Sequence, residues 1–346
     1  MKNKKKGQVT IFIIIAVLIV AGVLAYFLLR GNISTVNVPE NIQPAYTSFL
    51  SCLEEQVLVG ISILESQGGY IYLPGFEPGS QYMPFSSQLD FLGNPIPYWY
   101  YVSGNNIEKE QVPTKEVMER QFATFIASRA NNCNFDSYYE QGFQISLTEP
   151  NAAATSVSIK ENEVEVTLDA DFGIAKGEEN ALIKSHKVSV DSKLGGLYED
   201  AKKIYEEQQK TLFLEERAID VLRSYAPVDG VEISCSPLVW SADNVFDELQ
   251  NSIEANTIAL SSESNVDDYF SVKIPGVNNE VRFLNSKNRA SGFEVSPSEG
   301  AFLISNPVGN QAGMGILGFC YVPYHFVYDL SYPVLVQVYS GSSVES

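Results

Sequence analysis

Two aspartates at alternate positions, Asp169 and Asp171, are the most suggestive pair of chemical groups in this sequence of 346 residues. Carboxylates so spaced could hold a divalent metal for group transfer, and Glu161, Glu163 and Glu165 precede them. Carboxylates are the ligands that hard cations such as calcium prefer. Acidic and apolar residues alternate along this segment, however, as on a strand with one buried and one solvated face. We therefore interpret the acidic row as a solvated face and predict no metal site there.

The two histidines, His186 and His325, are the only residues on which a histidine-based catalytic triad could be built. His325 lies in the aromatic segment 324–328, which is typical of a packed core or edge strand. His186 stands between a serine and a lysine on a predicted strand, and we expect it at the surface. Neither histidine is predicted to be catalytic.

No other pattern predicts an enzyme. The glycine-rich segment 309–315 lacks the Lys-Ser or Lys-Thr pair that completes a phosphate-binding loop, so we expect an ordinary loop there. The chain has neither a G-x-S-x-G nucleophile elbow nor an H-E-x-x-H zinc motif. A pair of glycosidase-type carboxylates remains open, because no pattern selects one pair among 42 acidic residues. We predict no catalytic residues, cofactor or metal.

Four cysteines, Cys52, Cys133, Cys235 and Cys320, form an early couple and a late couple along the chain. An even number of cysteines outside the cytoplasm favours two disulfides, for which three pairings are possible. We predict Cys52–Cys133 and Cys235–Cys320, each closing a loop worth about 4 kcal/mol by chain entropy. Buried free thiols are the alternative. A zinc site is not expected, since no two cysteines have C-x2-C spacing.

The N-terminal residues 1–30 predict a membrane anchor. Val9 to Leu29 is an uncharged, almost wholly apolar run, long enough to span the roughly 30 Å of a bilayer's hydrocarbon core. Four lysines precede it, which places the N-terminus in the cytoplasm and the rest of the chain outside. A cleaved secretory signal is the alternative, but its apolar region is shorter, about 7–15 residues. We expect residues 9–29 to stay in the membrane, in contact with lipid.

Three lysines and Gly7, followed by Gln8-Val-Thr-Ile-Phe12 and an aliphatic helix, resemble the class III, prepilin-type signal of archaeal pilins and related surface proteins. The resemblance covers about the first 30 residues. It implies cleavage between Gly7 and Gln8, so that the helix becomes the new N-terminus. Phe12 stands where bacterial pilins usually have glutamate, and Pro39 predicts a break that pilin helices lack. More loosely, the whole chain looks like membrane-anchored proteins of small archaea.

The net charge of −19 is unevenly distributed. Residues 1–30 contribute +5, so the remaining residues together carry −24. Such an acidic chain is a poor candidate for binding nucleic acid, which requires cationic surface. The composition, 45% hydrophobic and 19% charged, is that of a globular protein with a core.

The element pattern predicts an α+β fold of antiparallel sheets with packed helices. We expect a leader and membrane anchor over 1–30 and a linker over 31–42. Three larger blocks follow: a helical and aromatic-loop region over 43–150, a unit of three strands and a long helix over 151–226, and a C-terminal β-rich unit over 227–346. Apolar spacing predicts helices over about 46–64, 113–131, 193–224 and 241–256. Strands are predicted near 157–159, 164–172 and 182–191, with a hairpin loop at 176–180.

Residues 68–105 are rich in proline and glycine and end in the aromatic run Tyr98-Trp-Tyr-Tyr101. Two interpretations stay open. The segment is either an ordered loop clamped over the core or an aromatic recognition surface for a glycan or a protein partner.

These features together predict a single-pass, cell-surface protein with a structural, adhesive or binding role and no enzymatic activity. The first alternative is a pilin-like subunit of a filament or secretion machine. The second is a membrane-tethered, carboxylate-dependent hydrolase.

Overall fold

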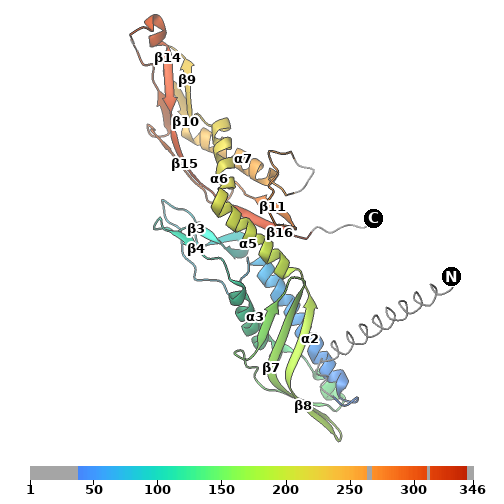
Figure 1. Ribbon diagram of the computed structural model, residues 1–346. Coiled ribbons are helices and arrows are strands. Elements are labelled where there is room, and N and C mark those ends of the chain that lie inside the picture. The colour runs from blue at the N-terminus through green and yellow to red at the C-terminus, as the bar shows by residue number, and fades with distance from the viewer. Residues whose placement is uncertain (1–37, 263–266, 310–311, 341–346) are drawn as a thin grey trace, which may run out of the picture. The chain divides into compact units, whose positions relative to one another are not determined.

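The computed structural model describes residues 38–262, 267–309 and 312–340 (Figure 1). The predicted anchor 9–29 and the processing site at Gly7 and Gln8 lie outside the described residues, so both stay predictions. Contacts divide the chain into two compact units. The first consists of the described part of 1–47 with 135–146 and 172–183, and the second consists of 48–134, 147–171 and the residues from 184 onward.

Helix α2 (Gln43–Ser66) confirms the first predicted helix and ends just before two glycines of positive φ, Gly68 and Gly69. Of the helices that the structure describes, it alone is long and apolar enough to cross a membrane. Leu53 and Val57 on its inner face have no exposed surface, however. Burial of these side chains is typical of a core helix of a folded domain, so α2 is weak evidence for membrane anchoring.

Helix α3 (Lys115–Arg129) begins where the sequence predicts, with the Thr114 side chain accepting a hydrogen bond from the Val117 amide. A short 3₁₀ turn, η1 (Ala130–Asn132), leads from it to Cys133. The sulfur of Cys133 is bonded to that of Cys52 on α2, which confirms the first predicted disulfide. The two helices are therefore linked covalently.

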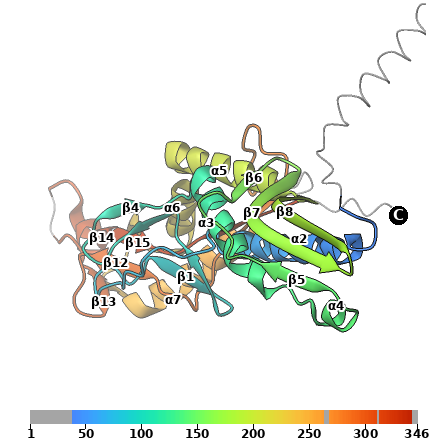
Figure 2. The same cartoon turned by 90° about the horizontal axis from the view of Figure 1, so that it is seen from below.

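A four-stranded antiparallel sheet is centred on β7 (Glu163–Lys176), which pairs with β5 (Gln144–Leu147), β6 (Ser156–Ile159) and β8 (Glu179–Asp191). Val164, Val166 and Leu168 of β7 have no exposed surface, while the acidic residues between them face outward. The predicted strand with one buried face is thus confirmed. The predicted hairpin loop is a tight turn at Gly177, whose φ is +65°. Figure 2 shows these strands and α2 from below.

In the first unit, Phe172 lies at the centre of an aromatic cluster, with ring centroids 6.0 Å from Tyr46 and 5.7 Å from Phe135. The short helix α4 (Asp136–Glu140) belongs to this unit. Its Tyr138 hydroxyl donates a hydrogen bond of 3.2 Å to the Pro44 carbonyl. These contacts give the first unit a small core of its own.

The predicted long helix over 193–224 is wrong in one respect, because the structure has two helices, α5 (Leu194–Thr211) and α6 (Phe213–Tyr225). The chain breaks at Leu212, which adopts a left-handed conformation with φ of 55°. The Gln208 side chain stabilises the break, since its carbonyl oxygen accepts a hydrogen bond of 3.0 Å from the Leu214 amide. Its amide group donates to the Glu215 carboxylate.

The C-terminal part combines antiparallel strand pairs with one helix, α7 (Ala242–Ala259), which confirms the fourth predicted helix. The pairs are β9 (Asp229–Ile233) with β14 (Tyr321–His325), β10 (Leu238–Ser241) with β13 (Phe302–Ser305), β11 (Glu280–Leu284) with β16 (Leu335–Tyr339), and β12 (Gly292–Ser296) with β15 (Val327–Ser331). Cys235 and Cys320 form the second predicted disulfide at the end of the β9–β14 pair. Two disulfides are typical of proteins from an oxidising, extracytoplasmic compartment.

Two core clusters join α5 and α6 to these C-terminal elements. Val221 of α6 packs with Leu249 and Ile253 of α7. Ile204 of α5 packs with Val281 and Phe283 of β11. Helices α5 and α6 therefore contribute to the core of the C-terminal strands as well as following the central sheet in the sequence.

Candidate functional site

The proline- and glycine-rich segment 68–105 forms ordered structure. Its strands β1 (Gln88–Phe91) and β2 (Asn94–Pro97) pair with each other, and β3 (Tyr100–Val102) pairs with β4 (Glu108–Glu110). Trp99 is fixed between the two pairs, because its indole N–H donates to the Gly68 carbonyl at 2.9 Å. Its own carbonyl accepts a hydrogen bond of 2.8 Å from the Gln111 amide. The segment is ordered, as the first interpretation predicts, and its aromatic run forms one wall of a cavity. The second interpretation, a recognition surface for a glycan or a protein partner, stays a prediction.

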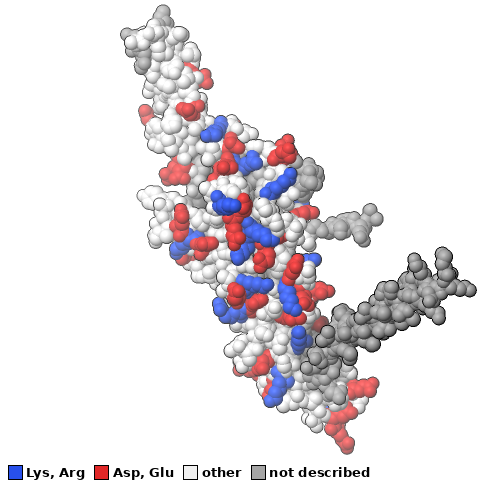
Figure 3. Space-filling view, viewed as in Figure 1, with Lys and Arg blue, Asp and Glu red and all other residues white. Residues whose placement is uncertain are grey.

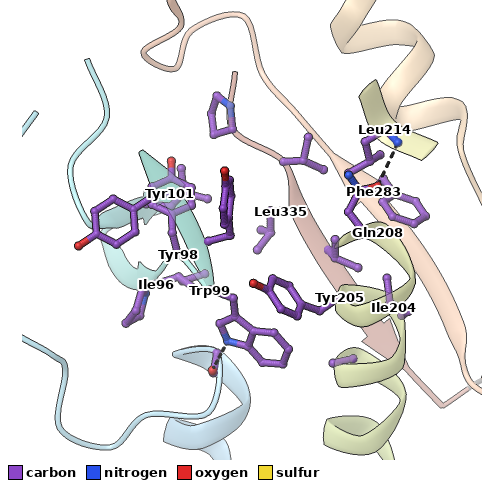
Figure 4. A pocket seen from close by; sticks show the side chains of 18 of the residues that line it. Ile96, Tyr98, Trp99, Tyr101, Ile204, Tyr205, Gln208, Leu214, Phe283 and Leu335 are labelled. Carbon is purple, nitrogen blue, oxygen red and sulfur yellow. Dashed lines mark hydrogen bonds between the residues drawn. The ribbon is translucent and has the colours of Figure 1, made fainter. Parts of the chain in front are cut away.

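This apolar cavity lies within the second unit and has a volume of about 910 Å³ (Figure 4). The first wall is the aromatic segment, the second consists of α5 and α6, and the third consists of β16, the residues before it and β11. Leu64 and Glu65 of α2 and Met118 of α3 complete the lining. The side chains that Figure 4 labels come from all three walls: Ile96, Tyr98, Trp99, Tyr101, Ile204, Tyr205, Gln208, Leu214, Phe283 and Leu335. The volume is at the upper end of the roughly 300–1,000 Å³ that small-molecule sites occupy.

The lining of the apolar cavity is aliphatic and aromatic, with few polar groups. Glu65 and Glu215 are its only charged residues in the part of the chain that the structure describes. The remaining polar groups include eight tyrosine hydroxyls and the amides of Gln208 and Gln209. An apolar lining with a few polar groups at defined places is the usual composition of a ligand site.

Trp99 is held rigidly where the first wall meets the second. Its ring centroid lies 5.8 Å from that of Tyr205 and 6.4 Å from that of Tyr198, both on α5 and both edge-on. The Tyr198 hydroxyl donates a hydrogen bond of 2.8 Å to the Pro113 carbonyl. Edge-to-face aromatic contacts of this kind each contribute about 0.5–1.5 kcal/mol beyond burial. The wall is therefore preformed.

The tyrosines of the walls stay protonated at neutral pH. Burial raises the pKa of Tyr328 to about 12, and burial together with the charge of Glu215 raises the pKa of Tyr332 to about 12. Burial also raises the pKa of Tyr98 to about 12, although the charge of Arg289 opposes the shift. These hydroxyls are consequently neutral hydrogen-bonding groups beside an apolar surface.

Asp169 and Asp171 lie on the solvent side of β7, where Asp169 is exposed and Asp171 is half-buried. The Asp171 amide donates a hydrogen bond of 2.9 Å to the Thr148 hydroxyl, and the Asp171 carbonyl accepts one of 3.0 Å from the Thr148 amide. Nowhere in the described ranges do three or more histidine, cysteine or acidic side chains gather so as to hold a metal ion.

The acidic row next to these aspartates is balanced by lysines. Lys160 forms ion pairs with Glu163 and Glu165, both at 2.8 Å. Figure 3 shows acidic and basic side chains interspersed over the visible face. The acidic row is a solvated face, as its alternation predicts.

The prediction that His186 lies at the surface is wrong. The residue has no exposed surface, and its Nε2 lies 2.9 Å from the Ala170 carbonyl oxygen. The ring meets Phe49 of α2 edge-on at 5.0 Å. The polar neighbours that suggested exposure point outward because side chains alternate along a strand, which turns His186 inward. Burial lowers its pKa below the usual value, so that the neutral imidazole is favoured.

His325 and the glycine-rich segment also lie outside the cavity lining. His325 is on β14, with most of its side chain exposed, and its Nδ1 lies 3.6 Å from an Asp229 carboxylate oxygen. Gly309, Gly313 and Gly315 adopt positive φ, a conformation that glycine takes without a steric penalty.

Sequence reasoning found one wall of the cavity and missed the other two. The second wall depends on the break at Leu212, and the third depends on residues 328–340, whose approach to the aromatic segment no local pattern indicates. The available signal was the unusual density of tyrosine near both Tyr98 and Tyr328.

Comparison of the chain with protein-family models, with curated proteins and with solved structures finds no match.

Proposed function

We propose that this chain is a membrane-anchored, extracytoplasmic binding protein without enzymatic activity, and that it holds an apolar or amphipathic ligand in the apolar cavity. The observation that carries the proposal is the large cavity with its aromatic and aliphatic lining. Removing an aliphatic chain from water gains about 0.8 kcal/mol per buried methylene. A cavity of this size therefore offers enough apolar surface to bind a single-chain molecule.

The arrangement of the walls supports binding rather than stability alone. Protein interiors are packed so closely that cavities larger than a water molecule are few. Here Phe283 and Ile204 line the cavity from well-packed core positions, whereas Trp99 and Tyr205 are only half-buried. A ligand chain would cover these rings without requiring the core to move.

The membrane anchor is part of the same proposal. Residues 9–29 support it through their length and lack of charge, and the two disulfides support an extracytoplasmic position. Mass spectrometry of the native N-terminus tests the anchor and its processing. A chain that begins at Gln8 would favour the pilin-like alternative, and a chain that begins at Met1 or Lys2 would favour a simple anchor.

Contact quenching of Trp99 tests the binding proposal. The full chain, carrying Trp240→Phe so that Trp99 is the only tryptophan, is placed in phosphatidylcholine nanodiscs free of detergent. Dodecanol with bromine at its chain end is then added, since bromine quenches an indole that it touches. We expect saturable quenching that Ala218→Phe, which fills space on the α6 wall, weakens at least tenfold.

A matched control is Ala153→Phe, on an exposed turn away from the cavity lining, for which we expect quenching like that of the parent chain. Quenching that fails to saturate, or that is the same in the Ala218 and Ala153 variants, would contradict the proposed cavity ligand.

A further inference from the structure

The carboxylates around the apolar cavity give it a charge preference. Glu215 lies in the first turn of α6 and lines the cavity while remaining exposed to solvent. Its carboxylate accepts a hydrogen bond from the Gln208 amide. Together with burial, its charge raises the pKa of Tyr100 and of Tyr332 in the walls. In the part of the chain that the structure describes, no lysine or arginine forms an ion pair with Glu215.

Two further carboxylates lie behind the wall tyrosines. Burial and the nearby carboxylate of Glu108 raise the pKa of Tyr100, and burial and the carboxylate of Glu110 raise the pKa of Tyr205. Both are on β4, and the lysine between them is engaged elsewhere, because Lys109 forms an ion pair of 2.6 Å with Glu77. Glu108 and Glu110 therefore add negative charge near the tyrosines of the walls.

Cations near the walls do not enter the lining. The charge of Arg289 opposes the larger effect of burial on the pKa of Tyr98, and its guanidinium lies 5.3 Å from the centroid of the Phe91 ring. Burial raises the pKa of Tyr101 and the charge of Lys109 lowers it, but Lys109 forms an ion pair with Glu77. An anionic headgroup would consequently meet carboxylates without a cation of the lining to pair with, at an energetic cost.

Aromatic faces add an attraction for positive charge. A cation within about 6 Å of a tryptophan or tyrosine ring gains about 0.5–1 kcal/mol at exposed sites and more when it is desolvated. Trp99 and Tyr205 present such rings beside the apolar cavity, and Tyr100 and Tyr332 present them near Glu215 (Figure 4 labels Trp99 and Tyr205).

We propose that the ligand is a single-chain amphiphile with a cationic head, an amine or a quaternary ammonium. Its aliphatic chain lies against Ile204, Phe283 and Leu335, and its head lies beside Glu215 and Tyr332. This inference rests on the proposed function and adds the charge of the ligand to it.

A headgroup series with one common chain tests the inference. Three dodecyl chains with terminal bromine, carrying trimethylammonium, hydroxyl or carboxylate, are titrated into the Trp240→Phe chain in phosphatidylcholine nanodiscs, with free ligand measured. We expect the ammonium to bind about tenfold more tightly than the alcohol, and the carboxylate to bind more weakly than the alcohol. Raising the salt concentration should reduce these differences.

Adjacent glutamates on α6 supply a matched pair of variants. Glu215→Gln should weaken ammonium binding about tenfold, a loss of about 1.4 kcal/mol. Glu216→Gln, an exposed residue outside the cavity lining, should leave it unchanged. The headgroup series in the parent chain does not depend on whether either variant folds.

The outcomes separate the two proposals. Absence of saturable quenching by the alcohol would overturn the proposed function itself. Quenching by the alcohol, with the ammonium binding no more tightly than the carboxylate or with equal effects of the two glutamine variants, would overturn the cationic ligand and leave the apolar cavity ligand standing.

Discussion

The helix-and-sheet region formed by α2, α3 and β6–β8 and the region around the apolar cavity use similar residues in opposite ways. In the first region, Phe49, Leu53 and Phe122 have no exposed surface. Around the cavity, by contrast, Trp99 and Tyr205 are only half-buried, although their rings are as large. The first region therefore buries its apolar side chains completely, whereas the second leaves part of its apolar surface uncovered, as the proposed ligand requires.

The tightness of the first region is visible at Gly60 on α2. A Cβ atom added at this position would overlap the ring of Phe122 on α3, so the two helices approach closely only because residue 60 is glycine. The cavity region has the opposite character at Ala201 and Ala218, small residues that line an open volume. Four predictions follow the comparison, from the largest effect to the smallest.

The largest expected effect is that of Phe122→Ala. Removing a fully buried ring leaves a void in a closely packed core and should cost about 3–5 kcal/mol of unfolding free energy, measured by urea denaturation. Ile219→Ala, in the cavity lining and 46% exposed, should cost less than about 1 kcal/mol. Equal losses for the two variants would mean that the regions do not differ in packing.

Loss of either disulfide is the second prediction. The bridges close loops of similar length, with separations of 81 and 85 residues, so the chain-entropy model gives about 4 kcal/mol for each. Double serine variants at Cys52 and Cys133, and at Cys235 and Cys320, should therefore lose similar stability. Thiol labelling of the unfolded, unreduced native chain should find no free cysteine, and labelling of four thiols would contradict the assigned bridges.

Ligand binding should stabilise the regions unequally. At a free concentration of 100 times Kd, a ligand that binds only the folded state adds about 2.7 kcal/mol to its stability. Hydrogen exchange in the presence of the brominated alcohol should slow most in α6 and β16, which line the cavity, and little in β6, which contributes no residue to the lining. Uniform protection of all elements would argue against a local cavity ligand.

The smallest expected effect is the pH dependence due to His186. Because burial lowers its pKa in the folded state, the folded chain binds this proton less readily than the unfolded chain, whose histidine has a pKa near 6.5. Stability should therefore fall as the pH drops below about 6.5 and until the folded pKa is reached, by at most about 1.4 kcal/mol per pH unit.

The other histidine supplies the control for this pH effect. His186→Gln should flatten the dependence of unfolding free energy on pH between about 7.5 and 5.5. Measured in parallel, His325→Gln separates the effect of His186 from that of the other, exposed histidine. An unchanged slope in the His186 variant would contradict the buried, neutral imidazole.

Elements with strong local periodicity were predictable from the sequence, including α2, α3 and the β7–β8 hairpin. Their signals lie within each segment, such as the glycines at 68 and 69 that end α2. Both cysteine pairings were predictable from the order of the cysteines along the chain. The break at Leu212 was not predictable from periodicity, because the apolar spacing continues across it. A leucine at positive φ has no compositional signature, and the groups that stabilise the break belong to Gln208.

The candidate site was only partly predictable for a related reason. Its aromatic wall appears in the sequence as Tyr98 to Tyr101, but the facing walls come from α5, α6 and segment 328–340, far away along the chain. Alternation gives the side of a strand that is buried and does not give the element that covers it. The same limit explains why the burial of His186 was not predicted. Alternation along β8 does not even show which of its two sides is buried, and in the structure His186 faces the Ala170 carbonyl.

The most direct test of a cavity ligand compares the two tryptophans of the chain. Trp99 lines the apolar cavity, while Trp240 packs in a core cluster with Phe326, outside the cavity lining. In the full chain in nanodiscs, Trp240→Phe leaves Trp99 as the reporter and Trp99→Phe leaves Trp240. We predict saturable quenching by bromododecanol in the first variant and none in the second. Equal quenching of both tryptophans, or of neither, would contradict the assignment of the apolar cavity as a ligand site.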